Sequence, residues 1–101
     1  FGRRPEGSAR RDQTNFMKGY VYILKSLKDN KQYIGSTINT ETRLLAHNNG
    51  NVISTKYRRP FVLKYIIDYE NIKIAAMMEK KFKKSHDVLR RELEKRGIVQ
   101  Q

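Results

Sequence analysis

The sequence predicts an α+β domain with a small antiparallel sheet and helices beside it. Its strand-like stretches are rich in β-branched and aromatic residues and lie at residues 20–25, 32–36 and 61–69. Its helix-like stretches are bounded by residues that start or stop helices and lie at residues 41–49, 71–84 and 85–97. In chain order these stretches predict β-β-α-β-α-α, an arrangement typical of an α+β domain.

The first two strands predict a hairpin, because Asp29 and Asn30 form a typical turn pair between them. A two-residue turn at this point would place Leu24 opposite Gly35. Side chains alternate between the two faces of a strand. One face of the hairpin would therefore carry Tyr22, Leu24, Tyr33 and Gly35, and the other face Val21, Ile23 and Ile34.

The helices are placed by their predicted ends. Thr40 is the predicted cap of the first helix, and the Asn-Asn-Gly run at 48–50 ends it. Asn71 is the predicted cap of the second helix, and Ser85 starts the last one. The strand at 61–69 is nearly continuously apolar, which predicts a central or well-covered place in the sheet.

The composition is that of one small, strongly basic domain. The chain has 101 residues, with 22 Lys and Arg against 10 Asp and Glu, a net charge of +12. This charge favours nucleic acid as the partner, and solvated lysine-rich helices are the alternative. The absence of cysteine excludes a disulfide framework, a cysteine-based zinc site and a thiol nucleophile, and it fits a cytoplasmic protein. Because no apolar run approaches the ~20 residues of a membrane span, we expect no membrane partner.

The first sixteen residues differ from the rest in composition. Residues 1–16 are rich in Gly, Arg and polar side chains, show no apolar periodicity and are followed directly by Met17. We interpret them as a disordered or vector-derived leader and residues 17–101 as the domain. The alternative interpretation is a functional basic arm.

Gly35 stands inside a predicted strand, where glycine weakens the structure and often marks the close approach of a ligand or another backbone. With Tyr22 and Tyr33 on the same face, the gap left by Gly35 predicts a phosphate-sized notch beside two hydroxyl groups. The alternative is ordinary: tyrosine favours strands, and Gly35 marks a bulge.

The first helix carries Arg43 and His47 four residues apart, so they share one face. An arginine and a histidine together can hold a phosphate and move a proton. Leu44 and Leu45 are expected to point to the core. The alternative is that Arg43 and His47 form a polar stripe facing solvent.

The second helix places a carboxylate within an apolar stripe. Ala75, Met78, Glu79 and Phe82 follow the helical spacing i, i+3, i+4, i+7. A buried carboxylate needs a partner, because its desolvation costs several kcal/mol. A divalent metal held by one carboxylate and substrate phosphate oxygens would supply one. The alternatives are a structural salt bridge and a Glu79 side chain that reaches solvent at the edge of the stripe.

Together these residues resemble the GIY-YIG nuclease superfamily. The resemblance rests on Tyr20-Val21-Tyr22, Tyr33-Ile34-Gly35, Arg43, His47 and Glu79, and it covers roughly residues 18–85. The first motif reads Y-V-Y where the family name has G-I-Y. The chain most resembles the small stand-alone bacterial members, which are similar to the catalytic domain of structure-specific endonucleases.

The resemblance implies a central three-stranded antiparallel sheet flanked by helices and hydrolysis of phosphodiesters with one divalent metal, Mg²⁺ or Mn²⁺. It implies that Glu79 holds the metal, that Tyr22 activates the attacking water and that Tyr33 orients the water or the phosphate. It further implies that Arg43 neutralises phosphate charge and that His47 takes or relays a proton. Gly35 would leave room for the backbone.

The expected substrate is DNA, whether branched, flapped or duplex, and RNA is not excluded. Lys56, Arg58 and Arg59 on the basic loop are expected to bind its phosphates. One active site is expected to nick one strand, and structure-specific relatives often use a partner subunit to select substrate. The competing function is a non-catalytic basic nucleic-acid-binding module. A basic structural protein of a ribonucleoprotein is a third.

Overall fold

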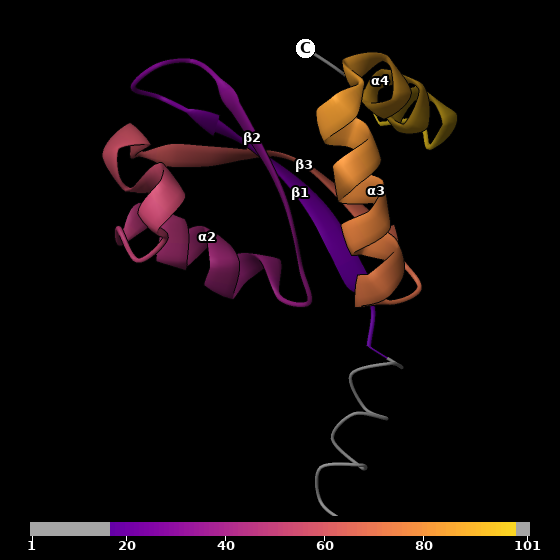
Figure 1. Cartoon of the computed structure of the whole chain (residues 1–101), viewed down its shortest axis with the longest axis horizontal. Helices are drawn as coiled ribbons and strands as arrows, with labels where there is room; N and C mark the ends of the chain where they lie inside the picture. The colour runs from indigo at the N-terminus through magenta and orange to yellow at the C-terminus, as the bar shows by residue number, and fades with distance from the viewer. Residues whose placement is uncertain (1–16, 99–101) are drawn as a thin grey trace, which may run out of the picture.

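The computed structural model describes residues 17–98, so the predicted leader at 1–16 lies outside the described residues. The elements are β1 (Gly19–Ser26), β2 (Gln32–Thr37), α2 (Thr40–Asn48), the 3₁₀ helix η1 (Ile53–Arg58), β3 (Phe61–Tyr69), α3 (Ile72–Lys84) and α4 (His86–Lys95). Their order confirms the α+β prediction. Figure 1 shows α2 on one side of the crossing strands and α3 and α4 on the other.

The sheet has three antiparallel strands in the order β2-β1-β3. β1 is central, and its Val21, Ile23 and Leu24 have no exposed surface. The prediction that 61–69 is central or well covered is wrong, because β3 is an edge strand on which Val62 and Ile66 are 39% and 38% exposed. An apolar run does not by itself distinguish an edge strand from a central one. Here β1 forms ladders on both sides and leaves β3 at the edge.

The hairpin loop is longer than the predicted two-residue turn. The backbone N–H of Ser26 donates to the carbonyl of Lys31 at 3.0 Å, and Asn30 has a φ of 62°. The Ser26 hydroxyl also accepts two backbone N–H groups of the loop, which stabilises this wider turn. The strand pairing is therefore shifted by two residues, and Gly35 lies opposite Tyr22 rather than Leu24. An even shift leaves the predicted faces unchanged.

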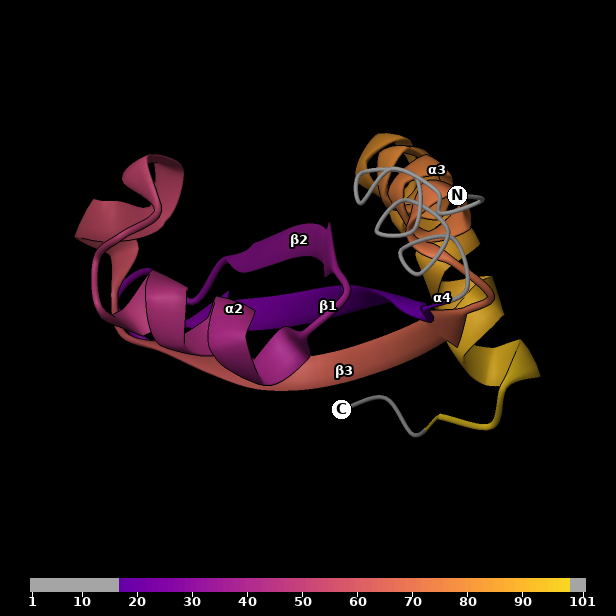
Figure 2. The same cartoon turned by 90° about the horizontal axis from the view of Figure 1, so that it is seen from below.

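The two faces of the sheet bury different clusters. On one face α3 and α4 cover Val21, Ile23, Ile34 and Ile67 with Ala75, Phe82, Leu89 and Leu93. On the other face a smaller cluster of Tyr22, Leu24 and Phe61 is joined by Tyr33 and Leu44. The expectation that Leu45 also points to the core is wrong, because it is 62% exposed. Figure 2 shows α2 toward one end of the strands and α3 and α4 toward the other.

Side-chain caps fix where the helices begin. Asn39 rather than Thr40 caps α2, and its side chain accepts the N–H of Thr42. Asn71 and Ser85 cap α3 and α4 as predicted. Within residues 17–98, every helix is too short or too polar to cross a membrane.

Candidate active site

Tyr22 is the centre of the smaller cluster and is 2% exposed. It lies on β1 directly opposite Gly35 of β2. A Cβ atom added to Gly35 would lie only 2.5 Å from the Tyr22 Cζ. The predicted empty notch over Gly35 is therefore wrong, because the Tyr22 ring fills that space. Gly35 serves the site by letting the ring lie flat across the neighbouring strand.

Two residues of α2 contact the Tyr22 hydroxyl from the same helix face. The Arg43 Nε donates to the Tyr22 Oη at 3.3 Å. The His47 Nε2 lies 3.0 Å from the same oxygen. His47 has no exposed surface, so the alternative of a solvent-facing stripe is wrong for this residue. A spacing of four residues on α2 thus brings a cation and an imidazole to one hydroxyl.

Thr55 of η1 completes this group from the other side of the imidazole. Its Oγ1 lies 2.8 Å from the His47 Nδ1 and 3.4 Å from the carbonyl of Val52, and the residue is fully buried. If Thr55 donates to that carbonyl, it accepts the Nδ1–H of His47. The His47 Nε2 is then free to accept the proton of Tyr22. Sequence reasoning missed this role of Thr55.

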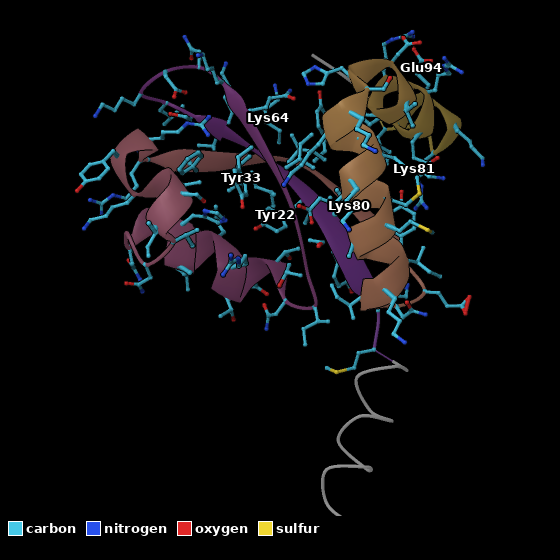
Figure 3. The ribbon with its side chains drawn as sticks, in the orientation of Figure 1. Tyr22, Tyr33, Lys64, Lys80, Lys81 and Glu94 are labelled. Atoms are coloured by element: carbon cyan, nitrogen blue, oxygen red, sulfur yellow. The ribbon has the colours of Figure 1, made fainter. Side chains whose placement is uncertain are left out.

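Tyr33 lies beside this hydrogen-bonded group. Its ring centroid is 4.8 Å from that of His47 and 6.2 Å from that of Tyr22. Phe61 closes the other side of the imidazole at 5.7 Å. Figure 3 shows Tyr22 and Tyr33 between α2 and α3. The predicted residues Tyr22, Tyr33, Arg43 and His47 are thus brought together, although they come from three elements.

Glu79 lies on α3 at the edge of its apolar stripe, with 19% of its side chain exposed. The Ser36 hydroxyl donates to its Oε1 at 2.6 Å, and the Lys83 ammonium lies 2.7 Å from its Oε2. The Lys83 Nζ also lies 5.9 Å from the centre of the Tyr33 ring, which connects Glu79 to the tyrosines. Ser36 was not singled out from the sequence, although its place beside Gly35 on β2 was a usable signal.

Glu79 meets one requirement of a divalent-metal site. Its Oε2 already lies 2.7 Å from a cation, the Lys83 ammonium, so the carboxylate is aimed at a place where positive charge is stabilised. Within residues 17–98 no group of three or more His, Cys, Asp or Glu residues gathers to hold a metal. These donors suit Mg²⁺ or Mn²⁺, which can be bound through one carboxylate together with water and substrate phosphates.

Burial moves the pKa values of Tyr22 and His47 in opposite directions. It raises the pKa of Tyr22 to about 12, against the opposing hydrogen bond from Arg43. It lowers the pKa of His47 to about 4, and the positive charge of Arg43 adds to this effect. Both groups are therefore neutral near pH 7, which is the state in which the hydroxyl donates and the imidazole accepts.

The three basic residues of the predicted substrate loop have different surroundings. Arg58 is half-buried and bonded to the hairpin loop, with its Nε 2.8 Å from the Asp29 Oδ2. Lys56 and Arg59 are exposed, and the Arg59 Nε donates to the Lys56 carbonyl at 2.8 Å. The Arg59 guanidinium also lies against Gly50, just after the end of α2. The phosphate-binding role of these residues stays a prediction.

We expect Gly35→Ala to destabilise the protein by roughly 1–3 kcal/mol, because the new Cβ forces the Tyr22 ring out of its place. Urea unfolding checks this. In the double variant Gly35→Ala/Tyr22→Ala the new Cβ no longer meets a tyrosine ring. The double variant should therefore lose clearly less free energy of unfolding than the sum of the two single losses. Additive losses would show that the crowding is elsewhere.

The lowered pKa of His47 predicts that the protein loses stability in mild acid. Its folded pKa of about 4 lies below its unfolded value of 6.5, so the unfolded chain takes up the proton first as the pH falls. Between pH 7 and pH 5 this lowers the free energy of unfolding by about 2 kcal/mol. Thermal melts of the wild type and His47→Gln at both pH values test this. The variant should lose most of that pH dependence, and an equal dependence in both proteins would contradict the assignment.

Comparison with known proteins identifies the family of this chain. A family model described as the GIY-YIG catalytic domain matches residues 18–92, which confirms the resemblance noted from the motifs. The chain is 53% identical over 49 residues to a UPF0213 protein of Staphylococcus haemolyticus, covering 48% of this chain and 58% of that protein. It is 46% identical over 66 residues to a UPF0213 protein of Clostridium perfringens, covering 64% and 70% respectively. The match thus spans less than two thirds of the staphylococcal protein. No solved structure gives a significant match.

Proposed function

Because the chain belongs to the GIY-YIG catalytic domain family, we propose that it is a metal-dependent nuclease that hydrolyses phosphodiester bonds in DNA. The observation that carries the proposal is the Tyr22 hydroxyl, which is held between the Arg43 guanidinium and the His47 imidazole. A hydroxyl held in this way can pass its proton to the imidazole, while the guanidinium stabilises the negative charge that develops on the oxygen. The net charge of +12 supports a polyanionic substrate.

In this proposal Tyr22 and His47 act as a proton relay. Tyr22 accepts a proton from the attacking water at its Oη, while its own proton passes over 3.0 Å to the His47 Nε2. The new oxygen–phosphorus bond forms as the bond to the leaving oxygen breaks, and solvent returns a proton to the leaving oxygen. A relay suits these residues better than a stable phenolate, because burial raises the pKa of Tyr22 to about 12.

Thr55 and Arg43 set the direction of that relay. By accepting the Nδ1–H of His47, Thr55 leaves the Nε2 lone pair facing Tyr22. Arg43 donates to the Tyr22 oxygen and stabilises negative charge that develops on it. The remaining N–H groups of its guanidinium suit a phosphate oxygen of the substrate. Tyr33, beside both rings, is the residue placed to orient the water or the phosphate.

Glu79 is the residue that would hold a divalent metal, with Ser36 fixing its Oε1. When bound, such an ion would supply Lewis-acid stabilisation of the phosphate and of the leaving oxygen. Lys83 would leave the Oε2 when the metal binds and remain free to contact a phosphate. We propose a cytoplasmic setting.

The test is cleavage of end-labelled oligonucleotides of one sequence, prepared as duplex, flap, four-way junction, single strand and RNA. Each is incubated with Mg²⁺, Mn²⁺ or EDTA. Cleavage of a DNA form with metal and none in EDTA supports the proposal. Binding without cleavage under every condition would overturn it in favour of the non-catalytic binding module.

A further inference from the structure

The 3₁₀ helix η1 is fixed to the rest of the domain along one side. A 3₁₀ helix has three residues per turn, so Thr55 and Arg58 share that side. Thr55 bonds His47, and Arg58 bonds Asp29 of the hairpin loop. The Ser26 hydroxyl also donates to the Arg58 carbonyl at 2.6 Å. Any group on the outer sides of η1 is thus held at a fixed position relative to the candidate active site.

The outer sides of η1 expose large apolar side chains. Tyr57 is 75% exposed and Ile53 is 89% exposed, although both sit on an anchored element rather than on a loose loop. The Lys28 ammonium donates to the Tyr57 carbonyl at 3.0 Å and holds the backbone behind the ring. The Tyr57 ring therefore stands out from the surface on a rigid support.

Two cations, Lys56 and Arg59, flank Tyr57 in the chain. The Lys56 Nζ lies 5.5 Å from the centre of the Tyr57 ring. Arg59 is exposed, and its Nε bond to the Lys56 carbonyl holds its guanidinium beside η1. The added Cβ of Gly50 would meet the Arg59 Nη1 at 2.7 Å, which shows how closely that guanidinium lies along the backbone. An aromatic face next to cations is complementary to a nucleotide, which combines a flat base with a phosphate.

We propose that the outer surface of η1 is a base-stacking platform for an unpaired nucleotide of the substrate. Tyr57 stacks on the base, and Lys56 and Arg59 bind the adjoining phosphates. This deepens the proposed function, on which it rests, by naming the substrate class as nucleic acid with a single-stranded or locally unpaired segment. An intact duplex keeps the flat faces of its bases stacked inside and offers only its backbone and the base edges in its grooves.

The test is fluorescence anisotropy of labelled oligonucleotides in EDTA, with the variants Tyr57→Ala and Tyr57→Phe. Tyr57→Ala should weaken binding of a single strand or flap about tenfold and of a blunt duplex less than twofold. Tyr57→Phe keeps the ring and should remain within twofold of the wild type. Met77→Ala removes a half-exposed apolar side chain from α3 and serves as the matched control.

An abasic strand separates stacking from charge, because it keeps the phosphates and lacks the base. The wild type should bind the abasic strand about as weakly as Tyr57→Ala binds the normal strand. Tyr57→Ala should bind the abasic strand with the same affinity as the wild type does. Three results would each overturn the platform. Tyr57→Ala could lose affinity equally for the single strand and the duplex, it could lose affinity for neither, or Tyr57→Phe could bind as weakly as Tyr57→Ala. Because binding is measured without metal, stacking with no cleavage would refute only the nuclease proposal. Cleavage without the Tyr57 effect would refute only the platform.

Discussion

Glu79→Gln is expected to lower metal-dependent cleavage at least about 100-fold while leaving nucleic-acid binding within about twofold. The substitution keeps the size of the side chain and an oxygen that can accept the Ser36 hydroxyl, but it removes the charge that now holds the Lys83 ammonium. A divalent ion held by one carboxylate loses its main protein ligand. Single-turnover cleavage at saturating enzyme gives the rate, and anisotropy in EDTA gives the binding.

The matched control is Glu94→Gln, because Glu94 lies on α4 and pairs with Arg90 at the surface. Figure 3 places Glu94 well away from Tyr22 and Tyr33. This variant should cleave like the wild type. Direct Mn²⁺ binding, measured by electron paramagnetic resonance, provides a second readout that should weaken in Glu79→Gln alone. Wild-type cleavage by Glu79→Gln would remove Glu79 from the metal site.

Tyr22→Phe is expected to lower the cleavage rate by about 10²–10⁴-fold, which is the usual contribution of a positioned acid–base group. The phenyl ring still fills the space over Gly35, so the fold persists. The loss of hydrogen bonds to Arg43 and His47 should cost about 1–2 kcal/mol of stability. Single-turnover rates at several pH values, with urea unfolding alongside, measure both effects.

Tyr69→Phe is the control that isolates the relay from simple loss of a buried hydroxyl. Burial raises the pKa of Tyr69 to about 12, as it does for Tyr22. Within the described residues, the Tyr69 hydroxyl is buried without a hydrogen-bond partner, and it contacts the larger core. Tyr69→Phe should therefore cleave at the wild-type rate. Comparable rates for Tyr22→Phe and Tyr69→Phe would rule out the relay.

The fold was largely predictable because its signals are local. The β-branched runs and the caps Asn71 and Ser85 each depend on neighbours in the chain. The hairpin register was not predictable in this way, because the Ser26 side chain stabilises a wider turn than Asp29-Asn30 alone suggests. The edge position of β3 was missed for a related reason. It depends on which strands pair, and an apolar run does not reveal that.

The candidate site was predictable where one side chain breaks a local pattern. Gly35 in a strand and Glu79 in an apolar stripe both do so, and each has a specific structural partner. Thr55 breaks no pattern, because a threonine in a polar loop is ordinary. Its role arises only when η1 folds against α2 and places its hydroxyl 2.8 Å from His47. Tertiary contacts of this kind carry no signal in a single sequence.

The most direct test of the central claim is the conversion of supercoiled plasmid by the purified wild-type chain. The reaction is run with Mg²⁺ or Mn²⁺ and with EDTA, and Tyr22→Phe and Glu79→Gln are run beside it. We predict nicked circles that appear with metal, vanish in EDTA and are nearly absent in both variants. Nicking that persists in EDTA, or that both variants retain at the wild-type rate, would contradict a metal-dependent nuclease centred on Tyr22 and Glu79.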